Sequence, residues 1–472
     1  MVDSGTDKLF QSRVRIYPRS VAGRFRRLKT AILLLAYGTY FLLPWLPWER
    51  RVGPPQAVLF DIEGRRFYLF DLVVHAQDIF WLAGLLVIAA LLLFFVTGLA
   101  GRVFCGYFCF QTLWTDVYLF IERKLQGERV ARIRLDRAPW GAEKIRKKLL
   151  THLLWLLVAF ATGLTFTLYW GYAPQLVRDF FTGQAPFAAY ATTLLLTLGT
   201  YVMAGLAREQ VCTYMCPYAR FQGVMFDRDT LVVAYDSKRG EGAAGRQRVR
   251  RGLKTAEERQ AAGVGDCIDC GFCVQVCPTG IDIRDGLQYQ CISCALCIDA
   301  CDTIMDSLGW PRGLVKYTSE KAQRGGKTRL LKAKNIGYAL VLVAAIAALA
   351  ASIIGQAPLE LSVAQVRQPL AVMLSDGRIQ NSYEIKINNK TDRRLALRLE
   401  LEGLVGAELD LGQVQGIELA PEQSLRLLAR VRLRPAVARS GRQAFRFVLT
   451  PLDPAAGTPL QEPAMFYLPE AR

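Results

Sequence analysis

Five stretches of the chain are apolar and contain no Asp, Glu, Lys or Arg. They are residues 30–48, 79–100, 149–170, 187–207 and 336–354. Each has about the ~20 residues that a helix needs to cross the hydrocarbon core of a bilayer, and buried helices of soluble proteins are rarely so uniformly apolar. The pattern predicts five transmembrane helices. The first stretch is not a cleaved signal peptide, because its apolar run is long and no small-residue cleavage site follows it.

A different pattern begins after the fifth apolar stretch, in residues 355–472. Apolar and polar residues alternate in residues 383–387, 395–401 and 445–447, and we interpret Asp376-Gly377 and Asn388-Asn389 as turns between them. Alternation of this kind is typical of half-buried strands. Several short strands in such a length predict a small antiparallel β-sandwich, immunoglobulin-like in type.

The distribution of charge gives these elements an orientation. The formal net charge is +18. Positive charge concentrates before the first span, between the second and third spans and between the fourth and fifth, whereas Arg178 alone occupies the loop between the third and fourth. Lys and Arg mark the cytoplasmic side of membrane proteins. We therefore expect the amino terminus in the cytoplasm and the carboxy-terminal domain outside. The positive charge is explained by contact with lipid and by this orientation, so we expect no binding of nucleic acid.

Eight of the twelve cysteines lie in two runs with the spacing of a two-cluster bacterial ferredoxin. In such ferredoxins each run supplies three thiolates to one 4Fe-4S cluster and the fourth to the other cluster. The spacing predicts a first cluster on Cys267, Cys270, Cys273 and Cys301, and a second on Cys291, Cys294, Cys297 and Cys277. Two structural zinc sites are the alternative, which the spacing disfavours because zinc ribbons use paired CxxC motifs.

The other four cysteines belong to an internal repeat. Cys105-x-Tyr-x-Cys109 and Cys212-x-Tyr-x-Cys216 each follow a Gly-Leu-Ala and an inward-running span, at a constant offset of 107 residues. If these segments are helical, each pair shares one helix face, and the four thiols converge near the cytoplasmic membrane surface. Soft thiolates favour Cu(I), zinc or iron-sulfur centres, and neighbouring thiols also cycle as a disulfide. Buried free cysteines that only pack are the alternative.

Histidine is too scarce for a haem site. The chain has two, His75 before the second span and His152 at the start of the third, and the predicted topology separates them by about ~30 Å, the thickness of the hydrocarbon core. They cannot jointly ligate one haem. For each alone, a role in packing or at the membrane interface is favoured over metal ligation.

With these parts assembled, the chain resembles the cytochrome c oxidase accessory proteins called CcoG, FixG or RdxA over nearly its whole length. The resemblance rests on the two cysteine pairs, the ferredoxin runs, the segments Phe180–Pro186 and Arg208–Pro217, and the outer stretch 376–390. It implies an electron-transfer protein of the bacterial inner membrane. Its implied activity is that of a cupric reductase, which supplies Cu(I) for assembly of cbb3-type oxidases together with copper-delivery proteins.

One departure from the family concerns the first pair. The family usually has proline after the second cysteine of both pairs, and here Phe110 replaces it whereas Pro217 keeps it. Proline restricts the backbone at a helix start. We therefore expect the backbone of the first motif to differ from that of the second.

Two other functions remain open from the sequence. One is a quinol-oxidising carrier like the membrane ferredoxin subunits of nitrate and nitrous-oxide respiration, which share the paired cysteines but are not expected to have the outer β-domain. The other is a scaffold for oxidase assembly whose clusters are structural. The electron donor is not identified by any motif.

The predicted architecture is an α-helical membrane protein with an α+β ferredoxin module and an outer immunoglobulin-like β-sandwich. The predicted parts are a basic terminus (1–29), two repeated hairpins (30–226), a basic linker (227–266), the ferredoxin module (267–335), the fifth span (336–354) and the β-domain (355–472).

Overall fold

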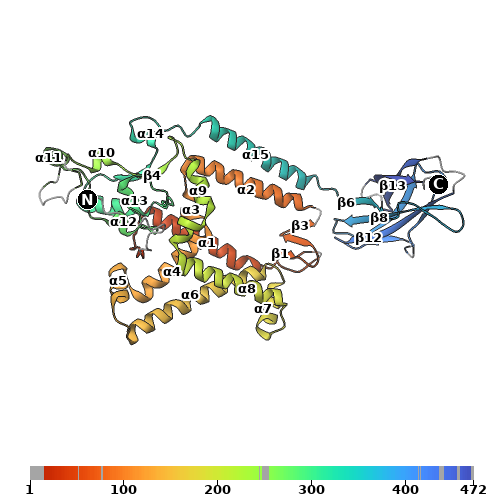
Figure 1. Cartoon of the computed structure of the whole chain (residues 1–472), viewed down its shortest axis with the longest axis horizontal. Helices are drawn as coiled ribbons and strands as arrows, with labels where there is room; N and C mark the ends of the chain where they lie inside the picture. The colour runs from red at the N-terminus through yellow and green to blue at the C-terminus, as the bar shows by residue number, and fades with distance from the viewer. Residues whose placement is uncertain are drawn as a thin grey trace, which may run out of the picture. The chain divides into compact units, whose positions relative to one another are not determined.

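The structure is a computed structural model and describes residues 15–50, 53–75, 78–243, 245–246, 253, 255–412, 414, 416–434, 441–453 and 458–468. Within these ranges, five helical segments are long and apolar enough to cross a membrane, which confirms the five predicted (Figure 1). They are α1 (Arg24–Leu42), α2 (Ile79–Ala100), α6 (Ala142–Leu168), α8 (Phe187–Thr200) continued by the π-helical turn η3 (Tyr201–Ala207), and α15 (Ala333–Ile354).

Two of these helices begin earlier than their apolar runs. Helix α1 starts six residues before residue 30 and α6 seven before residue 149, so that both open with a charged turn. Long basic side chains lay their stems along apolar surface and keep the charge in water. Hydropathy therefore located the apolar cores of these helices and missed their polar ends.

Short elements join the long helices. The helices are α3 (Val103–Tyr107), α4 (Phe110–Gln126), α5 (Arg129–Arg137), α7 (Ala173–Thr182), η4 (Val211–Met215) and α9 (Pro217–Val224). Strands β1 (Val58–Asp61), β2 (Arg66–Leu69) and β3 (Leu72–His75) form an antiparallel meander. It docks beside the end of α6, where the amide of Phe60 donates to the carbonyl of Tyr169 at 2.7 Å.

The ferredoxin module packs two short helices beside a two-stranded sheet. Helices α12 (Phe272–Gln275) and α13 (Leu296–Leu308) carry cysteines, and β4 (Val232–Tyr235) pairs antiparallel with β5 (Val315–Thr318). Strand β4 lies within residues 227–266, the stretch predicted as a linker, so part of that stretch belongs to the module. The basic residues Arg248, Arg250, Arg251 and Lys254 of this stretch lie outside the described residues.

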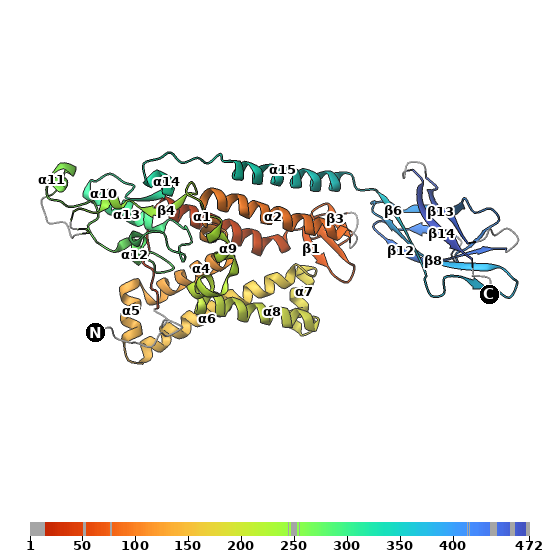
Figure 2. The ribbon, with the colours of Figure 1, turned by 45° about the horizontal axis from the view of Figure 1, so that its top comes forward.

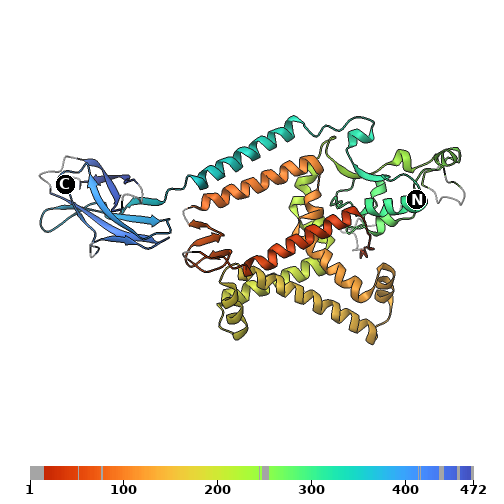
Figure 3. The same ribbon diagram turned by 180° about the vertical axis from the view of Figure 1, so that it is seen from behind.

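Helices α2 and α15 run side by side, as both Figure 2 and Figure 3 show. Their contact uses a small residue at one end and rings at the other. A Cβ on Gly84 would lie 3.4 Å from Leu349, and the rings of Phe94 and Tyr338 are 6.3 Å apart between centroids. Small residues let membrane helices approach closely.

The carboxy-terminal domain is a β-sandwich of two sheets. One sheet has the order β10-β12-β8-β6 with β7 against β8, and the other has the order β11-β9-β13-β14. The strands are β6 (Leu359–Gln365), β7 (Val372–Met373), β8 (Ile379–Asn389), β9 (Leu395–Glu402), β10 (Glu408–Asp410), β11 (Ile417–Leu419), β12 (Ser424–Leu433), β13 (Arg442–Pro451) and β14 (Leu460–Tyr467). The predicted alternating stretches fall in β8, β9 and β13.

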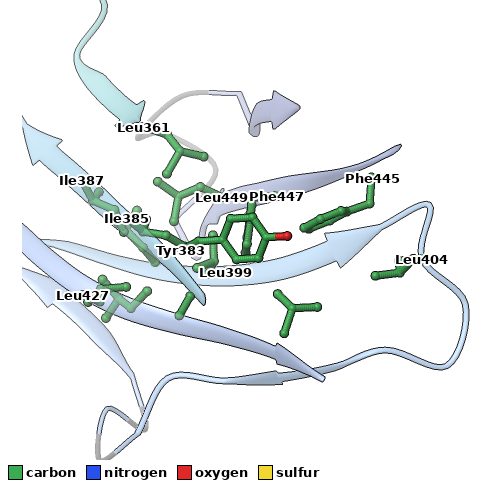
Figure 4. Packing of buried hydrophobic residues seen from close by; sticks show 14 of the residues in the cluster. Leu361, Tyr383, Ile385, Ile387, Leu399, Leu404, Leu427, Phe445, Phe447 and Leu449 are labelled. Carbon is green, nitrogen blue, oxygen red and sulfur yellow. The ribbon is translucent and has the colours of Figure 1, made fainter. Parts of the chain in front are cut away.

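The core of this domain lies between the two sheets (Figure 4). Tyr383 from one sheet meets Phe445 and Phe447 from the other edge-to-face, with ring centroids 5.6 and 5.3 Å apart. The Tyr383 hydroxyl also donates to the carbonyl of Met465 at 2.7 Å, so this buried ring satisfies its polar end.

One predicted turn of this domain is wrong. Asn388 and Asn389 end strand β8 and are buried. The side-chain amide of Asn389 donates to the carbonyls of Arg393 at 2.7 Å and Ala420 at 3.0 Å. Asparagine side chains bind nearby backbone in this way at strand ends as well as in turns, which is why composition alone misplaced the turn.

Candidate iron-sulfur and thiol sites

Two cavities of nearly equal size lie in the ferredoxin module. The first encloses about 370 Å³ of empty space and is lined by the cysteines Cys267, Cys270, Cys273 and Cys301. The second has about 360 Å³ of empty space and is lined by Cys277, Cys291, Cys294 and Cys297, and also by Cys273. Each set contains three cysteines of one run and the last cysteine of the other. The two groupings are the two ligand sets that the spacing predicts.

The loops that line the two cavities have matching backbones. Asp269 and Ser293, two residues after the first cysteine of each run, have φ of 52° and 53°. Gly271 and Ala295, two residues further on, have φ of 65° and 60°. Left-handed residues of this kind turn successive backbone N–H groups inward and make concavities that hold anions, iron-sulfur clusters among them. The repetition makes the two sites pseudo-symmetric.

The donor set of the cavities fits iron-sulfur clusters better than zinc. Among the described residues, no three His, Cys, Asp or Glu side chains come close enough to hold one metal ion. A zinc ion draws four thiolates to about 2.3 Å from itself, whereas a cluster spreads them around a cuboid. Burial raises the pKa of Cys273, Cys294 and Cys301 to about 12, so ligation displaces protons from these thiols.

The paired cysteines flank breaks in the chain rather than lying on one helical face. Cys105 lies within α3, but Cys109 has an extended backbone and precedes α4. Cys212 lies within η4, and Cys216 in turn is extended and precedes α9. The conditional expectation of a shared helix face is therefore wrong, because each second cysteine caps a new helix.

Replacement of proline by Phe110 does not change the cap. Cys109 has φ −64° and ψ 125°, close to the −81° and 110° of Cys216 before Pro217. The two repeats also share a residue with a positive φ before each pair. Gly101 has φ 59°, and Arg208, at the matching position, has φ 48°. The expected difference at the second cysteine is absent, and the difference lies instead in α3 being α-helical where η4 is π-helical.

The four paired thiols lie within electrostatic range of one another. Burial raises the pKa of Cys105, with Arg102 opposing the rise and Cys109 and Cys216 adding to it. Burial, reinforced by Cys109 and Cys105, raises the pKa of Cys212 to about 12. The pKa of each of these two thiols thus responds to cysteines of the other pair. The Cys105 thiol donates a hydrogen bond to Oε1 of Gln222 at 3.0 Å.

The first pair docks directly on the cluster-two loop (residues 291–297). Cys105 shares a buried apolar cluster with Cys294 and Ile292. A Cβ added to Gly106 would lie 2.7 Å from the carbonyl oxygen of Ile292 and 2.9 Å from the Cα of Cys294. The hydroxyl of Tyr107 donates to the carbonyl of Cys294 at 3.1 Å. The sequence motif gave no sign that this glycine makes a contact, because the contact is to a loop far away in the sequence.

The second pair reaches the same region through Tyr289. The Tyr289 hydroxyl donates to the carbonyl of Thr213, between Cys212 and Cys216, at 2.9 Å. The guanidinium of Arg102 donates to the carbonyl of Tyr289 from the other side. Arg102 is 3% exposed. Both cysteine pairs are therefore held by hydrogen bonds or packing to the chain that leads into the cluster-two loop.

The two histidines occupy separate places. His75 ends β3, and His152 lies in α6, where its Nδ1 is 2.9 Å from the hydroxyl of Tyr201. His152 lines a cavity with about 1310 Å³ of empty space together with Glu122 and Trp155. Neither histidine lines a cysteine cavity.

Family models match three parts of the chain. A 4Fe-4S dicluster domain matches residues 207–320, and a 4Fe-4S binding domain matches residues 82–127, which contain the first cysteine pair. The IG-like fold at the carboxy terminus of FixG matches residues 349–469. These matches cover the second half of the first membrane repeat, the second cysteine pair with the ferredoxin module, and the β-sandwich.

Curated relatives are similar over most of the chain. Protein RdxB of Cereibacter sphaeroides is 43% identical over 82% of this chain and 82% of its own length. Protein RdxA of the same organism is 41% identical over 88% of each chain. Nitrogen fixation protein FixG of Rhizobium meliloti is 38% identical over 86% of this chain and 83% of its own.

Proposed function

The chain belongs to the FixG/RdxA family of iron-sulfur electron-transfer proteins, and from this premise we propose that it reduces Cu(II) to Cu(I) for assembly of cbb3-type cytochrome c oxidases. The observation that carries the proposal is the contact between Gly106 and the backbone of Cys294. It places a pair of soft thiol ligands against the loop that lines the second cavity. Thiolates prefer Cu(I), the product of the reduction.

The ligands that we propose follow the two cavities. Cys267, Cys270, Cys273 and Cys301 would hold one 4Fe-4S cluster, and Cys277, Cys291, Cys294 and Cys297 the other. Such clusters store and pass single electrons. The protein around the second cavity excludes water, since Cys294 and Ile292 are buried. Cys105, Cys109, Cys212 and Cys216 would bind copper or exchange electrons with it.

We further propose that the protein lies in the bacterial inner membrane with its ferredoxin module in the cytoplasm and its β-domain in the periplasm. The basic residues at the cytoplasmic helix ends support this orientation. In it, the paired cysteines lie on the reducing side, where thiols stay reduced. The partners would be a cbb3-type oxidase, copper-delivery proteins and an electron donor of unassigned identity.

The experiment that tests the proposal is a stoichiometric titration. Anaerobically purified protein is reduced, and Cu(II) is added while iron-sulfur absorbance and Cu(I)-specific chelation are followed. The proposal expects one Cu(I) for each electron lost from the clusters. Clusters that stay reduced in the presence of excess Cu(II) would refute it.

A second candidate, quinol oxidation, is favoured by the cavity around His152. Oxidation of a quinol releases two protons, and this cavity brings an imidazole and the buried carboxylate of Glu122 together beside the indole of Trp155. The outer β-domain is the argument against it. Adding a reduced quinone analogue to the oxidised protein separates the candidates, because only a quinol carrier reduces its clusters in that assay.

A further inference from the structure

A cavity with about 650 Å³ of empty space lies between the membrane helices and the ferredoxin module. Its walls come from the chain around α1, from α4 and from the ferredoxin loops. Thr279, Ile292 and Leu296 line both this cavity and the second cysteine cavity, so one layer of side chains separates the two. Cys212 lines it as well. We call it the junction cavity.

Positive charge dominates the wall formed by α1 and α4. Lys29, Arg26 and Arg123 line the junction cavity beside the carboxylate of Asp116, and Arg19, Arg208 and Glu209 line the same cavity. Burial alone would raise the pKa of Asp116. The nearby cations, Lys29 above all, instead hold this pKa below its usual range. Burial and the neighbouring Arg26 lower the pKa of Arg123. The lining of the cavity thus contains five cations and two carboxylates.

Lys29 is the cation without a direct partner. Both oxygens of Asp116 already accept hydrogen bonds from Arg26, at 2.9 Å each. Lys29 is 2% exposed, and no described residue forms a hydrogen bond or an ion pair within 4 Å of its ammonium group. A buried charge without a partner is costly. Because this ammonium group lines a cavity, an anionic ligand in the cavity would pair with it.

Resting on the function proposed above, we infer that the junction cavity binds the copper substrate as an anionic carboxylate complex, held by Lys29, Arg26 and Arg123. Free aquated Cu(II) is repelled by this wall, whereas carboxylate oxygens suit both the cations and Cu(II), which takes oxygen and nitrogen ligands in a tetragonal arrangement.

The position of the cavity accounts for both the source of the electron and the binding of the product. A reduced cluster held by the cysteines of the second cavity would supply the one electron that converts Cu(II) to Cu(I), and no bond within the carboxylate ligand would break. Cu(I) is soft and prefers thiolate to carboxylate. The thiol of Cys212 on the cavity wall is then a ligand for the product, and its proton is released when the metal binds.

The test begins with binding, which needs no copper. Citrate is titrated calorimetrically into the full-length protein in detergent. Lys29→Met should weaken citrate binding about tenfold or more, as expected for loss of a charged hydrogen bond, and Lys29→Arg should retain most of it. Lys124→Met is the matched control, because Lys124 is exposed on the same helix as Arg123 and does not line the cavity. If Lys29→Met misfolds, as judged by iron content and gel filtration, Arg123→Gln takes its place.

The second arm compares two copper complexes. Copper(II) citrate is anionic, and copper(II) bis-ethylenediamine is cationic. Lys29→Met should raise the KM for the citrate complex by the same factor as the citrate Kd and leave the KM for the cationic complex unchanged or lower. An equal effect on both complexes, or citrate binding that is unchanged by Lys29→Met, would overturn the inference.

Two outcomes separate this inference from the function on which it rests. If no copper complex oxidises the reduced protein but citrate binding depends on Lys29, copper reduction is refuted and the anion site stands. If phosphatidylglycerol nanodiscs abolish citrate binding and copper reduction in the parent, whereas phosphatidylcholine nanodiscs do not, then the cavity belongs to an anionic lipid headgroup and the copper assignment is overturned.

Discussion

Gly106 touches the backbone of Cys294 so closely that no side chain fits between them. The space where a Cβ would stand is 2.9 Å from the Cα and 3.0 Å from the amide nitrogen of Cys294. A cysteine pair at the end of α2 and a loop of the ferredoxin module, nearly 190 positions apart in the sequence, therefore meet backbone to backbone. A glycine is required there because the neighbouring atoms are main chain and cannot rotate away.

Gly106→Ala should separate the two segments. The added methyl forces α3 or the cluster-two loop to move, so we expect slower cluster oxidation by Cu(II) and an altered EPR signal from the second cluster only. Gly223→Ala is the control, because it also lies in a short helix and a Cβ there meets nothing within 4 Å. An unchanged rate and spectrum in Gly106→Ala would show that this contact does not matter for transfer.

Cys301→Ala should abolish the first cluster although Cys301 belongs to the second run. The cavity lined by Cys267, Cys270 and Cys273 also contains Cys301, and that exchange of fourth ligands is the mark of the two-cluster ferredoxin fold. Iron content should fall by about half, and EPR should retain the second cluster. Cys277→Ala should give the converse result. Loss of the second cluster in Cys301→Ala would contradict the exchange.

The positions of charged loops predict the topology. Reporter fusions at Gly127, Gln184, Gly325 and Gly412 should give cytoplasmic, periplasmic, cytoplasmic and periplasmic signals in that order. Alkaline phosphatase and green fluorescent protein serve as complementary reporters. A cytoplasmic signal at Gly412 would mean that α15 does not cross the membrane.

Glu122 links stability to pH. It is 2% exposed and paired with Arg208 at 2.6 Å and Arg132 at 3.2 Å. Burial would raise its pKa, but the two arginines hold it below the ordinary 4.5. A carboxyl group whose pKa is lower in the folded than in the unfolded state stabilises the fold at pH values above its unfolded-state pKa. That stabilisation is lost as the pH falls through the folded-state pKa. Glu122 should therefore protect the fold at neutral pH and cease to do so in acid.

Glu122→Gln tests this directly. Leaving two buried guanidiniums without a carboxylate should cost about 3–5 kcal/mol at neutral pH. The melting temperature of the variant should also fall less than that of the parent as the pH falls from about 5 through the depressed folded-state pKa of Glu122. Glu143→Gln serves as the control, since Glu143 is exposed and pairs only with Lys147 one turn away. Parallel acid profiles for the parent and Glu122→Gln would refute the link.

Features that depend on residues close together in the sequence could be predicted, and features that depend on distant segments could not. Each ferredoxin cavity is lined by the four cysteines that the spacing assigns to one cluster, because local loops bring most of these cysteines together, and the clusters themselves stay a prediction. Apolar runs predicted the five spans, because the bilayer imposes length on every helix. By contrast, Lys29 was one of eight basic residues before the first span, and its isolation around Asp116 depends on α4, which hydropathy did not reveal.

Tertiary contacts account for the remaining errors. The paired cysteines have helical spacing, yet Cys109 and Cys216 adopt extended backbones because each caps a following helix. Phe110 takes the place of a proline without changing the cap, since an extended residue before a helix needs no proline after it. Arg208 has positive φ at the position where the first repeat has Gly101, and its ion pair with Glu122 compensates a strain that sequence reasoning had no means to foresee.

The double variant Cys212→Ser, Cys216→Ser decides whether the paired cysteines act in copper chemistry. Serine keeps the size of each side chain but is a poor ligand for Cu(I). Because these residues line neither ferredoxin cavity, both iron-sulfur signals and the full iron content should survive. Cu(II)-dependent oxidation of the clusters should fall to the background rate, and oxidase activity in cells should weaken. Thr213→Ser, between the two cysteines, is the control because its contact to Tyr289 is made by the backbone carbonyl. If the double variant reduces Cu(II) at the parental rate, copper receives its electron directly from the clusters, and the four cysteines serve only in packing.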